Sequence, residues 1–164
     1  MDISRISLRP MRDGDVSEIE NWPSYKDAFA QMDYALRQNG WLDEYFNRPG
    51  SWCYAAQTDA GIVGFALLLT RGAKDAELRI AIHPEKTRQG FGRRVMISLM
   101  EKGFSELGLD TIHLVVRKNN FSAKRLYDRL GFINRGECTL LIQNVSVEFF
   151  KMDIHKQEFQ GDEE

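Results

Sequence analysis

The feature that most constrains the fold is a change of hydrophobic period within one stretch of the chain. Residues Ala76 to His83 alternate between apolar and polar side chains, as a half-buried strand does. From about Gly90 to Leu107 the apolar residues recur at helical spacing instead. Thr111 to Arg117 then returns to the pattern of a strand. A strand, a helix and a strand in succession predict an α/β domain.

The remaining segments extend this pattern on both sides. Further strands are expected at Ile3–Arg9, Trp52–Thr58, Ile62–Thr70, about Ile133–Ile142 and Val145–His155. Further helices are expected around Val16 to Glu20, where Asp13-Gly14-Asp15 offers N-cap chemistry, once or twice within 22–48, and at about Phe121–Leu130, ending at Gly131. This order predicts one central, mixed sheet.

Length and composition favour a single soluble domain. A chain of 164 residues suits one core, so we expect one domain over 1–158 and an acidic tail without fixed structure over 159–164. The apolar fraction is 43% and the charged fraction 28%, as in ordinary globular proteins. The net charge of −2 gives no whole-chain attraction for nucleic acid or an anionic membrane, so neither is expected as a partner.

Membrane insertion, disulfides and metal binding are not predicted. The longest apolar run, Ile62 to Leu69, is too short to span a bilayer, and the first residues do not resemble a signal peptide. Cys53 and Cys138 are too few and too far apart for a disulfide framework or a zinc site. We therefore expect a reduced, cytoplasmic setting.

A glycine turn at the start of the second half is a candidate anion site. Gly90-Phe91-Gly92 lies between a strand and a helix, whose first N–H groups and dipole favour a phosphate. Arg88, Arg93 and Arg94 add positive charge. The lysine-serine pair of a P-loop and a full G-x-G-x-x-G are absent. From these residues alone, an ordinary turn with solvated arginines is equally plausible.

Two motifs within residues 78–132 resemble a known family. The pattern N-x-x-A-x-x-L-Y-x-x-x-G-F begins at Asn120 and ends at Phe132, and it follows the glycine turn by about thirty residues. Together they closely resemble the GNAT superfamily of acetyl-CoA-dependent N-acetyltransferases. The resemblance implies a mixed, mostly antiparallel twisted sheet of six to seven strands with about four helices, splayed between the fourth and fifth strands. It also implies transfer of an acetyl group from acetyl-CoA directly to a primary amine.

The resemblance assigns the donor-binding residues. The loop that cradles the pyrophosphate of coenzyme A corresponds to Arg88, Gln89, Gly90, Phe91, Gly92 and Arg93. The usual first Gln or Arg of that loop is Thr87 here, so donor affinity is expected to be lower. The pantetheine arm would lie against the strand at Ile80, Ala81 and Ile82. Asn120 would contact the pantetheine or support the start of its helix.

The resemblance makes Tyr127 the expected general acid for the departing thiolate. The base is less defined, because Val115 occupies the position of a glutamate found in some members. Glu77 is our choice, with a salt bridge as its alternative, and His83 or solvent water are others. An acetyl-cysteine route through Cys53 or Cys138 is disfavoured.

The acceptor is predicted only as an amine. By resemblance, 22–48 and the final hairpin line its side of the site, although most aromatic residues there are expected to be core. A peptide N-terminus, a lysine and an amine-bearing small molecule all stay open. A homodimer through the last strands is also an open expectation. The rival functions are an acetyl-CoA sensor or interaction module without transfer activity, and a nucleotide-binding protein that holds ATP at the glycine loop.

Overall fold

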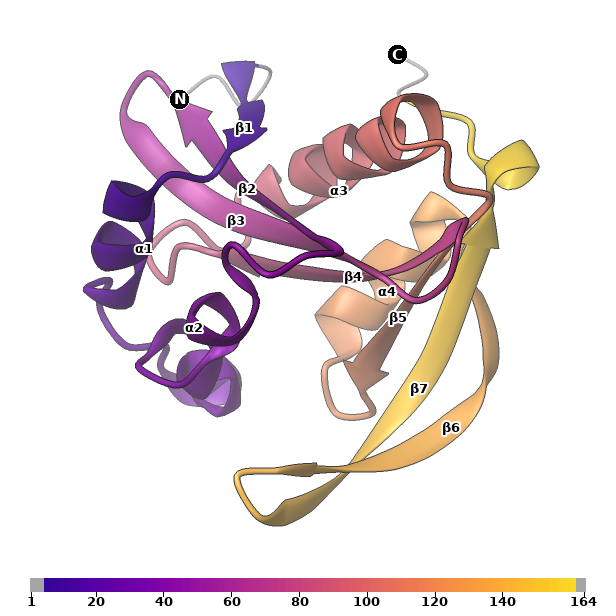
Figure 1. The fold of residues 1–164 in the computed structure, drawn as a ribbon. Helices are drawn as coiled ribbons and strands as arrows, with labels where there is room; N and C mark the ends of the chain where they lie inside the picture. Colours follow the sequence, from indigo (N-terminus) through magenta and orange to yellow (C-terminus); the bar gives the residue numbers. More distant parts are fainter. Residues whose placement is uncertain (1–4, 162–164) are drawn as a thin grey trace. The chain divides into compact units, whose positions relative to one another are not determined.

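The computed structural model describes residues 5–161, which fall into two compact units (Figure 1). Unit 1 combines Met1–Leu69 with Arg79–Leu99, and unit 2 combines Thr70–Leu78 with Met100–Glu164. Hydrogen bonding links seven strands in the order β1-β2-β3-β4-β5-β7-β6. The sheet is mixed and mostly antiparallel, as predicted.

Unit 1 packs its helical segments against β3. Its elements are β1 (Ser7–Pro10), α1 (Asp13–Glu20), the 3-10 helix η2 (Asp27–Leu36), α2 (Trp41–Tyr45), β2 (Ser51–Thr58), β3 (Gly61–Thr70), and parts of β4 (Asp75–Ile82) and α3 (Phe91–Glu101). Phe65, Leu67 and Leu69 alternate on β3 and share a buried cluster with residues of α1, η2 and α2. This alternation places one face of the strand in the core.

Unit 2 is built on β5. Its elements are the π-helical turn η3 (Lys102–Glu106), β5 (Thr111–Arg117), α4 (Phe121–Leu130), β6 (Ile133–Ile142), β7 (Val145–His155) and η4 (Lys156–Glu158). The first residues of β4 pair with β5 in parallel, Asp75–Glu77 alongside Thr111–His113. β5 pairs with β7 and β7 with β6 in antiparallel register. Figure 1 shows β6 and β7 as one long hairpin.

Most predicted elements are confirmed, and the differences have local causes. The first strand begins at Ser7 among the described residues, and residues 1–4 and 162–164 lie outside them. The predicted helix from Gly90 to Leu107 is α-helical only to Glu101 and then widens into η3. Within 22–48, η2 is a 3-10 helix. Contacts with other parts of unit 1 hold it in place. Phe159, assigned to the tail, packs its ring against Phe104 at 5.5 Å.

Asp15, rather than Asp13, organises the start of α1. Its carboxylate accepts two hydrogen bonds from the Arg9 guanidinium, at 2.7 and 2.9 Å, and one from the Arg12 amide at 2.8 Å. The hydrogen bonds from Arg9 are the main reason that the pKa of Asp15 lies below its ordinary value. The charged carboxylate is therefore the form that stabilises the fold.

We expect Asp15→Asn to lower the free energy of unfolding by about 1–3 kcal/mol, since charge-assisted hydrogen bonds are lost. Because the folded pKa is depressed, this contribution is present at neutral pH and disappears as pH falls below about 4. The free energy of unfolding from urea titrations should therefore differ less between pH 7 and pH 3 for the variant than for the wild type. The exposed Asp13 serves as control, and Asp13→Asn should lower the free energy of unfolding at pH 7 by less than Asp15→Asn does. An equal loss in both variants would contradict this role of Asp15.

Candidate functional site

The loop between β4 and α3 is folded by hydrogen bonds among its own residues. The His83 carbonyl accepts from the Lys86 amide at 2.8 Å, and the Glu85 amide donates to Nδ1 of His83 at 3.0 Å. Two residues have positive φ, Arg88 at 62° and Gly90 at 89°. This region is costly for residues with a Cβ, which explains the glycine at position 90.

α3 begins directly after this loop. Phe91 is buried and anchors the first turn in the core, while the Arg94 amide donates back to the Gly90 carbonyl at 3.4 Å. The first amides of a helix have no acceptor within it, and the dipole places partial positive charge there. The loop and first turn therefore bring together all six residues predicted to hold a pyrophosphate: Arg88, Gln89, Gly90, Phe91, Gly92 and Arg93. Their arrangement suits a phosphate group.

Arg88 lies against η2, in the segment between β1 and β2. Its guanidinium carbon stands 5.3 Å from the centre of the Phe29 ring, within the range of a cation–π contact. Phe29 belongs to η2. One cation of the glycine loop is thus held in place by the segment predicted to face the acceptor.

The end of β4 has one main-chain edge bonded to β3 and one edge turned away from it. The His83 amide donates to the Val63 carbonyl of the β3 side at 2.8 Å. Because main-chain groups alternate along a strand, those of Ala81 also point towards β3, and those of Ile80 and Ile82 point the other way. The Ile80 and Ile82 groups are therefore the ones that suit pairing with an added chain.

Gly64 of β3 keeps this part of the sheet closely packed. A Cβ at this position would lie 2.9 Å from the Ala81 carbonyl oxygen and 3.0 Å from Cδ1 of Ile82. A Cβ contact under 3.0 Å is essentially never seen, so the Ala81 carbonyl would have to shift. Glycine here lets β3 approach the end of β4.

Aromatic residues of 22–48 contact Arg79 on β4 and His83 directly after it. The Arg79 guanidinium lies over the Trp41 ring at 5.3 Å and the Tyr45 ring at 5.0 Å. The imidazole of His83 lies 4.8 Å from the Trp22 ring. Most of these aromatics are core, as predicted. Burial lowers the pKa of His83, and its Nδ1 already accepts a hydrogen bond, so His83 has the character of a loop-edge residue.

Tyr25 is a residue that sequence reasoning missed. Its hydroxyl donates a hydrogen bond to the Ile82 carbonyl, and its ring is buried in the core of unit 1. Tyr25 and Ile82 are 57 positions apart. No local pattern in the sequence could have paired them.

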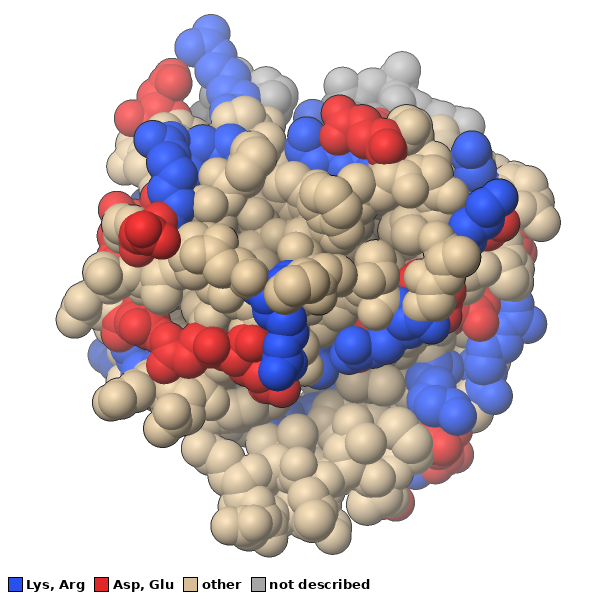
Figure 2. Space-filling view, in the orientation of Figure 1, with Lys and Arg blue, Asp and Glu red and all other residues tan. Residues whose placement is uncertain are grey.

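The acidic side chains over α1 and α2 form a band on the surface of unit 1 (Figure 2). Within these helices, the carboxyl groups of Glu20 and Asp43 lie close enough to affect each other's protonation. Burial and the Asp43 carboxyl raise the pKa of Glu20 to about 7. This pair therefore binds a proton near neutral pH.

Tyr127 lies in unit 2, on α4. The helix starts at Asn120, whose side chain accepts from the Ala123 amide at 3.3 Å, and it ends at Gly131 with φ of 102°. The Tyr127 side chain is buried beside Phe132, with the ring centres 5.9 Å apart. Burial raises the pKa of Tyr127 to about 12, so the hydroxyl keeps its proton at any physiological pH. Asn120 acts as the predicted helix support.

The base candidate Glu77 is engaged in an ion pair. Its Oε1 accepts from Nη2 of Arg71 at 2.7 Å, and its side chain is 13% exposed. This is the salt bridge that we named as the alternative role. It places a carboxylate at a fixed position on β4, where it pairs in register with His113.

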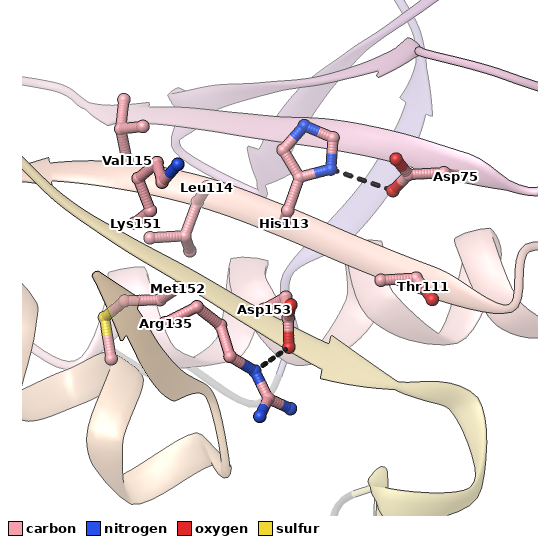
Figure 3. A pocket seen from close by; sticks show the side chains of 9 residues that line it. All are labelled: Asp75, Thr111, His113, Leu114, Val115, Arg135, Lys151, Met152 and Asp153. Carbon is pink, nitrogen blue, oxygen red and sulfur yellow. Dashed lines mark hydrogen bonds and ion pairs between the residues drawn. The ribbon is translucent and has the colours of Figure 1, made fainter. Parts of the chain in front are cut away.

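A pocket lies on the sheet face of unit 2 that carries His113 and Val115 (Figure 3). Its volume is about 340 Å³, and it is lined by Asp75, Thr111, His113, Leu114, Val115, Arg135, Lys151, Met152 and Asp153. Nδ1 of His113 lies 2.8 Å from the Asp75 carboxylate, and Nε of Arg135 lies 3.0 Å from Asp153. Sequence reasoning missed the first pair because it depends on the parallel register of β4 and β5.

Cys53 is poorly suited to nucleophilic chemistry. Cys53 and Cys138 are free, and burial raises the pKa of Cys53 to about 11. A thiol with this pKa is almost entirely protonated at neutral pH. Within residues 5–161, no group of three acidic, histidine or cysteine side chains could hold a metal ion. No helix among these residues is long and apolar enough to cross a membrane.

The strand order and the glycine loop define an α/β protein of the acetyltransferase type. The model of the Acetyltransferase (GNAT) family matches residues 15–132. The chain belongs to this family.

Similar curated proteins are N-acetyltransferases. The spermidine N(1)-acetyltransferase of Escherichia coli K12 is 26% identical over 139 residues, which are 80% of this chain and 75% of that protein. The uncharacterized N-acetyltransferase YoaA of Bacillus subtilis is 37% identical over 76 residues, 46% of this chain. The aligned parts span 42% of YoaA and 57% of a second Bacillus subtilis relative, YvbK. A ribosomal protein bS18-alanine N-acetyltransferase of Haemophilus ducreyi is 30% identical over 71 residues, 43% of this chain and 48% of that protein.

Solved structures confirm the fold. The spermidine N-acetyltransferase of Vibrio cholerae in complex with CoA and spermine has a TM-score of 0.75. The comparison covers 94% of this chain and 98% of that chain at 20% sequence identity.

Proposed function

We propose that this chain transfers an acetyl group from acetyl-CoA directly to a primary amine. The observation that supports this proposal is the loop in which Gly90, at φ of 89°, leads into the start of α3. This geometry presents main-chain amides to a diphosphate, as acyl-coenzyme A binding requires. Membership of the family supplies the reaction class.

Each proposed donor contact uses a group with suitable chemistry. The six loop residues from Arg88 to Arg93 bind the diphosphate, chiefly through their amides. The main-chain groups of Ile80 and Ile82 pair with the pantetheine arm in the manner of an added strand, and Ala81 packs between them. A main-chain N–H on this strand polarises the thioester carbonyl. Asn120 contributes by fixing the start of α4.

The transfer moves two protons. The amine nitrogen forms a bond to the carbonyl carbon, the carbon–sulfur bond breaks, and the amine loses a proton to a base. Tyr127 then gives its proton to the departing thiolate, so that free thiol leaves. The buried phenol is protonated and so has a proton to give, and its raised pKa makes it a weaker acid than an ordinary tyrosine.

Glu77 is the proposed base, directly or through one water. We expect Glu77→Gln to lower kcat by about 10²-fold, the scale of general base catalysis. Arg71→Gln is the matched control, because it removes the same ion pair but leaves the carboxylate. Initial rates of thiol release over a pH series, with thermal melting of both variants, make the comparison. If the two variants lose the same stability and neither loses activity, the ion pair is purely structural.

The acceptor is an amine whose class is to be found by screening. The names of the relatives suggest two arms for the screen, spermidine as a polyamine and short peptides with an N-terminal alanine. Lysine-containing peptides and other small amines complete it. The experiment is a thiol-release assay with acetyl-CoA and each amine, followed by mass spectrometry of the product. A mass increase of one acetyl group supports transfer.

The rival functions give different results in the thiol-release assay and in a thermal-shift measurement. Binding of acetyl-CoA without free thiol from any amine would favour a sensor or interaction module. A thermal shift with ATP but none with acetyl-CoA would favour the nucleotide-binding alternative, since selective ligands stabilise the folded state.

We also propose a homodimer through the final strands. β6 is an edge strand, and the turn region of its hairpin exposes Leu141 and Val145, at 72% and 61%. Such edges favour pairing with another chain. Sedimentation at two protein concentrations tests this.

A further inference from the structure

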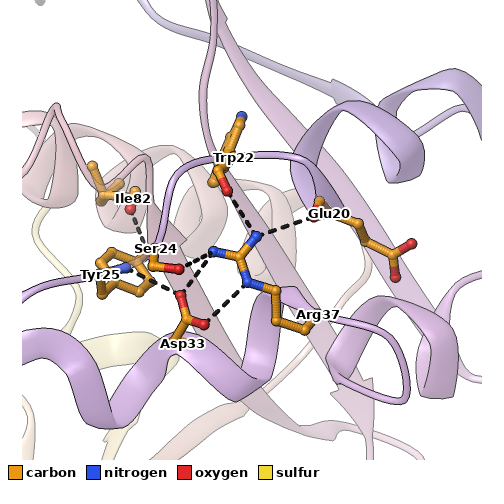
Figure 4. A network of polar contacts seen from close by, with 7 residues as sticks. All are labelled: Glu20, Trp22, Ser24, Tyr25, Asp33, Arg37 and Ile82. Atoms are coloured by element: carbon orange, nitrogen blue, oxygen red, sulfur yellow. Dashed lines mark hydrogen bonds and ion pairs between the residues drawn. The ribbon is translucent and has the colours of Figure 1, made fainter.

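We propose that Tyr25 is a positioning residue that makes donor binding and the placement of residues 22–37 depend on each other. The inference rests on the proposed function, because it takes the donor to pair with the end of β4. The observation behind the proposal is the hydrogen bond from the Tyr25 hydroxyl to the Ile82 carbonyl (Figure 4). This bond joins a segment assigned to the acceptor side to a strand assigned to the donor.

The bond uses a main-chain group that an added chain would need. The Ile82 carbonyl points away from β3, because the neighbouring His83 amide bonds towards it. A chain that pairs with this edge takes its hydrogen bonds from Ile80 and Ile82. The hydroxyl of Tyr25 bonds to this carbonyl oxygen and would compete for it with an added chain. Burial raises the pKa of Tyr25, so its hydroxyl is a permanent donor.

The other side of Tyr25 is held by charged groups. Its amide donates to Oδ1 of Asp33 at 3.1 Å, and Arg37 binds both carboxylate oxygens of Asp33 at 2.9 and 3.1 Å. The same guanidinium donates to the carbonyls of Trp22 at 2.7 Å and Glu20 at 3.1 Å. Figure 4 shows these groups converging on one point between α1 and η2. We call Tyr25, Asp33 and Arg37 the clasp.

The clasp predicts an order of events. Pairing of the donor with β4 displaces the Tyr25 hydroxyl from Ile82, and the clasp then loses its attachment to the strand. Residues 22–37 become free to adjust around an acceptor only after the donor has bound. The lost hydrogen bond opposes donor binding, so the hydroxyl lowers donor affinity in the wild type.

Calorimetric titration with coenzyme A tests the displacement. Tyr25→Phe removes the hydroxyl and keeps the buried ring, and we expect it to bind coenzyme A about two- to tenfold more tightly than the wild type. Tyr34→Phe, in the helix η2 that follows Tyr25, is the matched control and should bind as the wild type does. A merely structural tyrosine would leave the affinity unchanged or weaken it, and either result overturns the proposal.

Amide hydrogen exchange provides the second measurement. Coenzyme A should speed exchange within residues 24–37 of the wild type and leave that of Tyr25→Phe unchanged. Slower exchange in the wild type would show that the clasp is not released. Should Tyr25→Phe not fold, Asp33→Asn weakens the clasp from its other end and should also tighten binding, and unchanged binding counts against the clasp. If the wild type binds no coenzyme A, the proposed function fails as well; binding without a difference between variants refutes the clasp alone.

Discussion

Tyr127→Phe is expected to lower kcat for acetyl transfer by about 10²- to 10⁴-fold while the affinity for coenzyme A stays near that of the wild type. The reason is that the phenol supplies a proton to the thiolate and makes no other proposed contribution to donor binding. The ring, which packs beside Phe132, is retained in the variant. Rapid-quench measurement of the transfer step, with calorimetry for coenzyme A, separates the two quantities.

The pH dependence gives a further check on Tyr127. A raised pKa keeps the acid form present at higher pH than an ordinary tyrosine, whose pKa is about 10. Because burial raises the pKa of Tyr127, the wild-type rate should not fall through loss of this proton near pH 10, where an ordinary tyrosine ionises. Tyr54→Phe is the control, because it removes the hydroxyl of another buried tyrosine. A Tyr127→Phe variant with wild-type turnover would leave Tyr127 as a packing residue and assign the acid to another group.

Gly90→Ala should weaken coenzyme A binding by at least tenfold. At φ of 89° a Cβ is strained, so the loop shifts and its amides no longer converge on a diphosphate. The sharpest readout compares acetyl-CoA with a short acetyl thioester that lacks the diphosphate. The value of kcat/KM should fall for the first donor and hold for the second.

Gly108→Ala is the matched control for Gly90→Ala. Gly108 has φ of 70° and no neighbouring atoms within 4 Å of an added Cβ, so the substitution adds a similar backbone strain without a clash. We expect a loss of stability of about 1 kcal/mol and unchanged donor affinity. Equal weakening of coenzyme A binding by both variants would mean that general destabilisation, not the loop, sets the affinity.

The sequence was most informative where the signals are local. The bounds of α4 could be predicted because Asn120 caps its start and Gly131, in the left-handed conformation, ends it. The final hairpin could be predicted because Gln143 and Asn144 form the turn, and both have positive φ. The glycine loop could also be predicted, because its glycines are a local signal in the sequence.

The sequence was least informative where distant contacts decide. η2 is held through Arg37, whose guanidinium binds carbonyls of an earlier segment. The spacing of apolar residues along a helix does not predict such a contact. The partner of Tyr25 lies on β4, and the pairing of His113 with Asp75 needs the parallel register. The ion pair of Glu77 with Arg71 was anticipated only as one of two roles. These features arise from tertiary packing.

The close packing at Gly64 affects how mutational scans of this protein should be interpreted. A single methyl group there would press on the Ala81 carbonyl and the Ile82 side chain from the strand behind them. Such a variant would look like a donor-binding defect although residue 64 touches no substrate. Inactive clones from saturation mutagenesis therefore outline a wider region than the true contact surface, and suppressors of a Gly64 defect should be sought among smaller side chains at position 82.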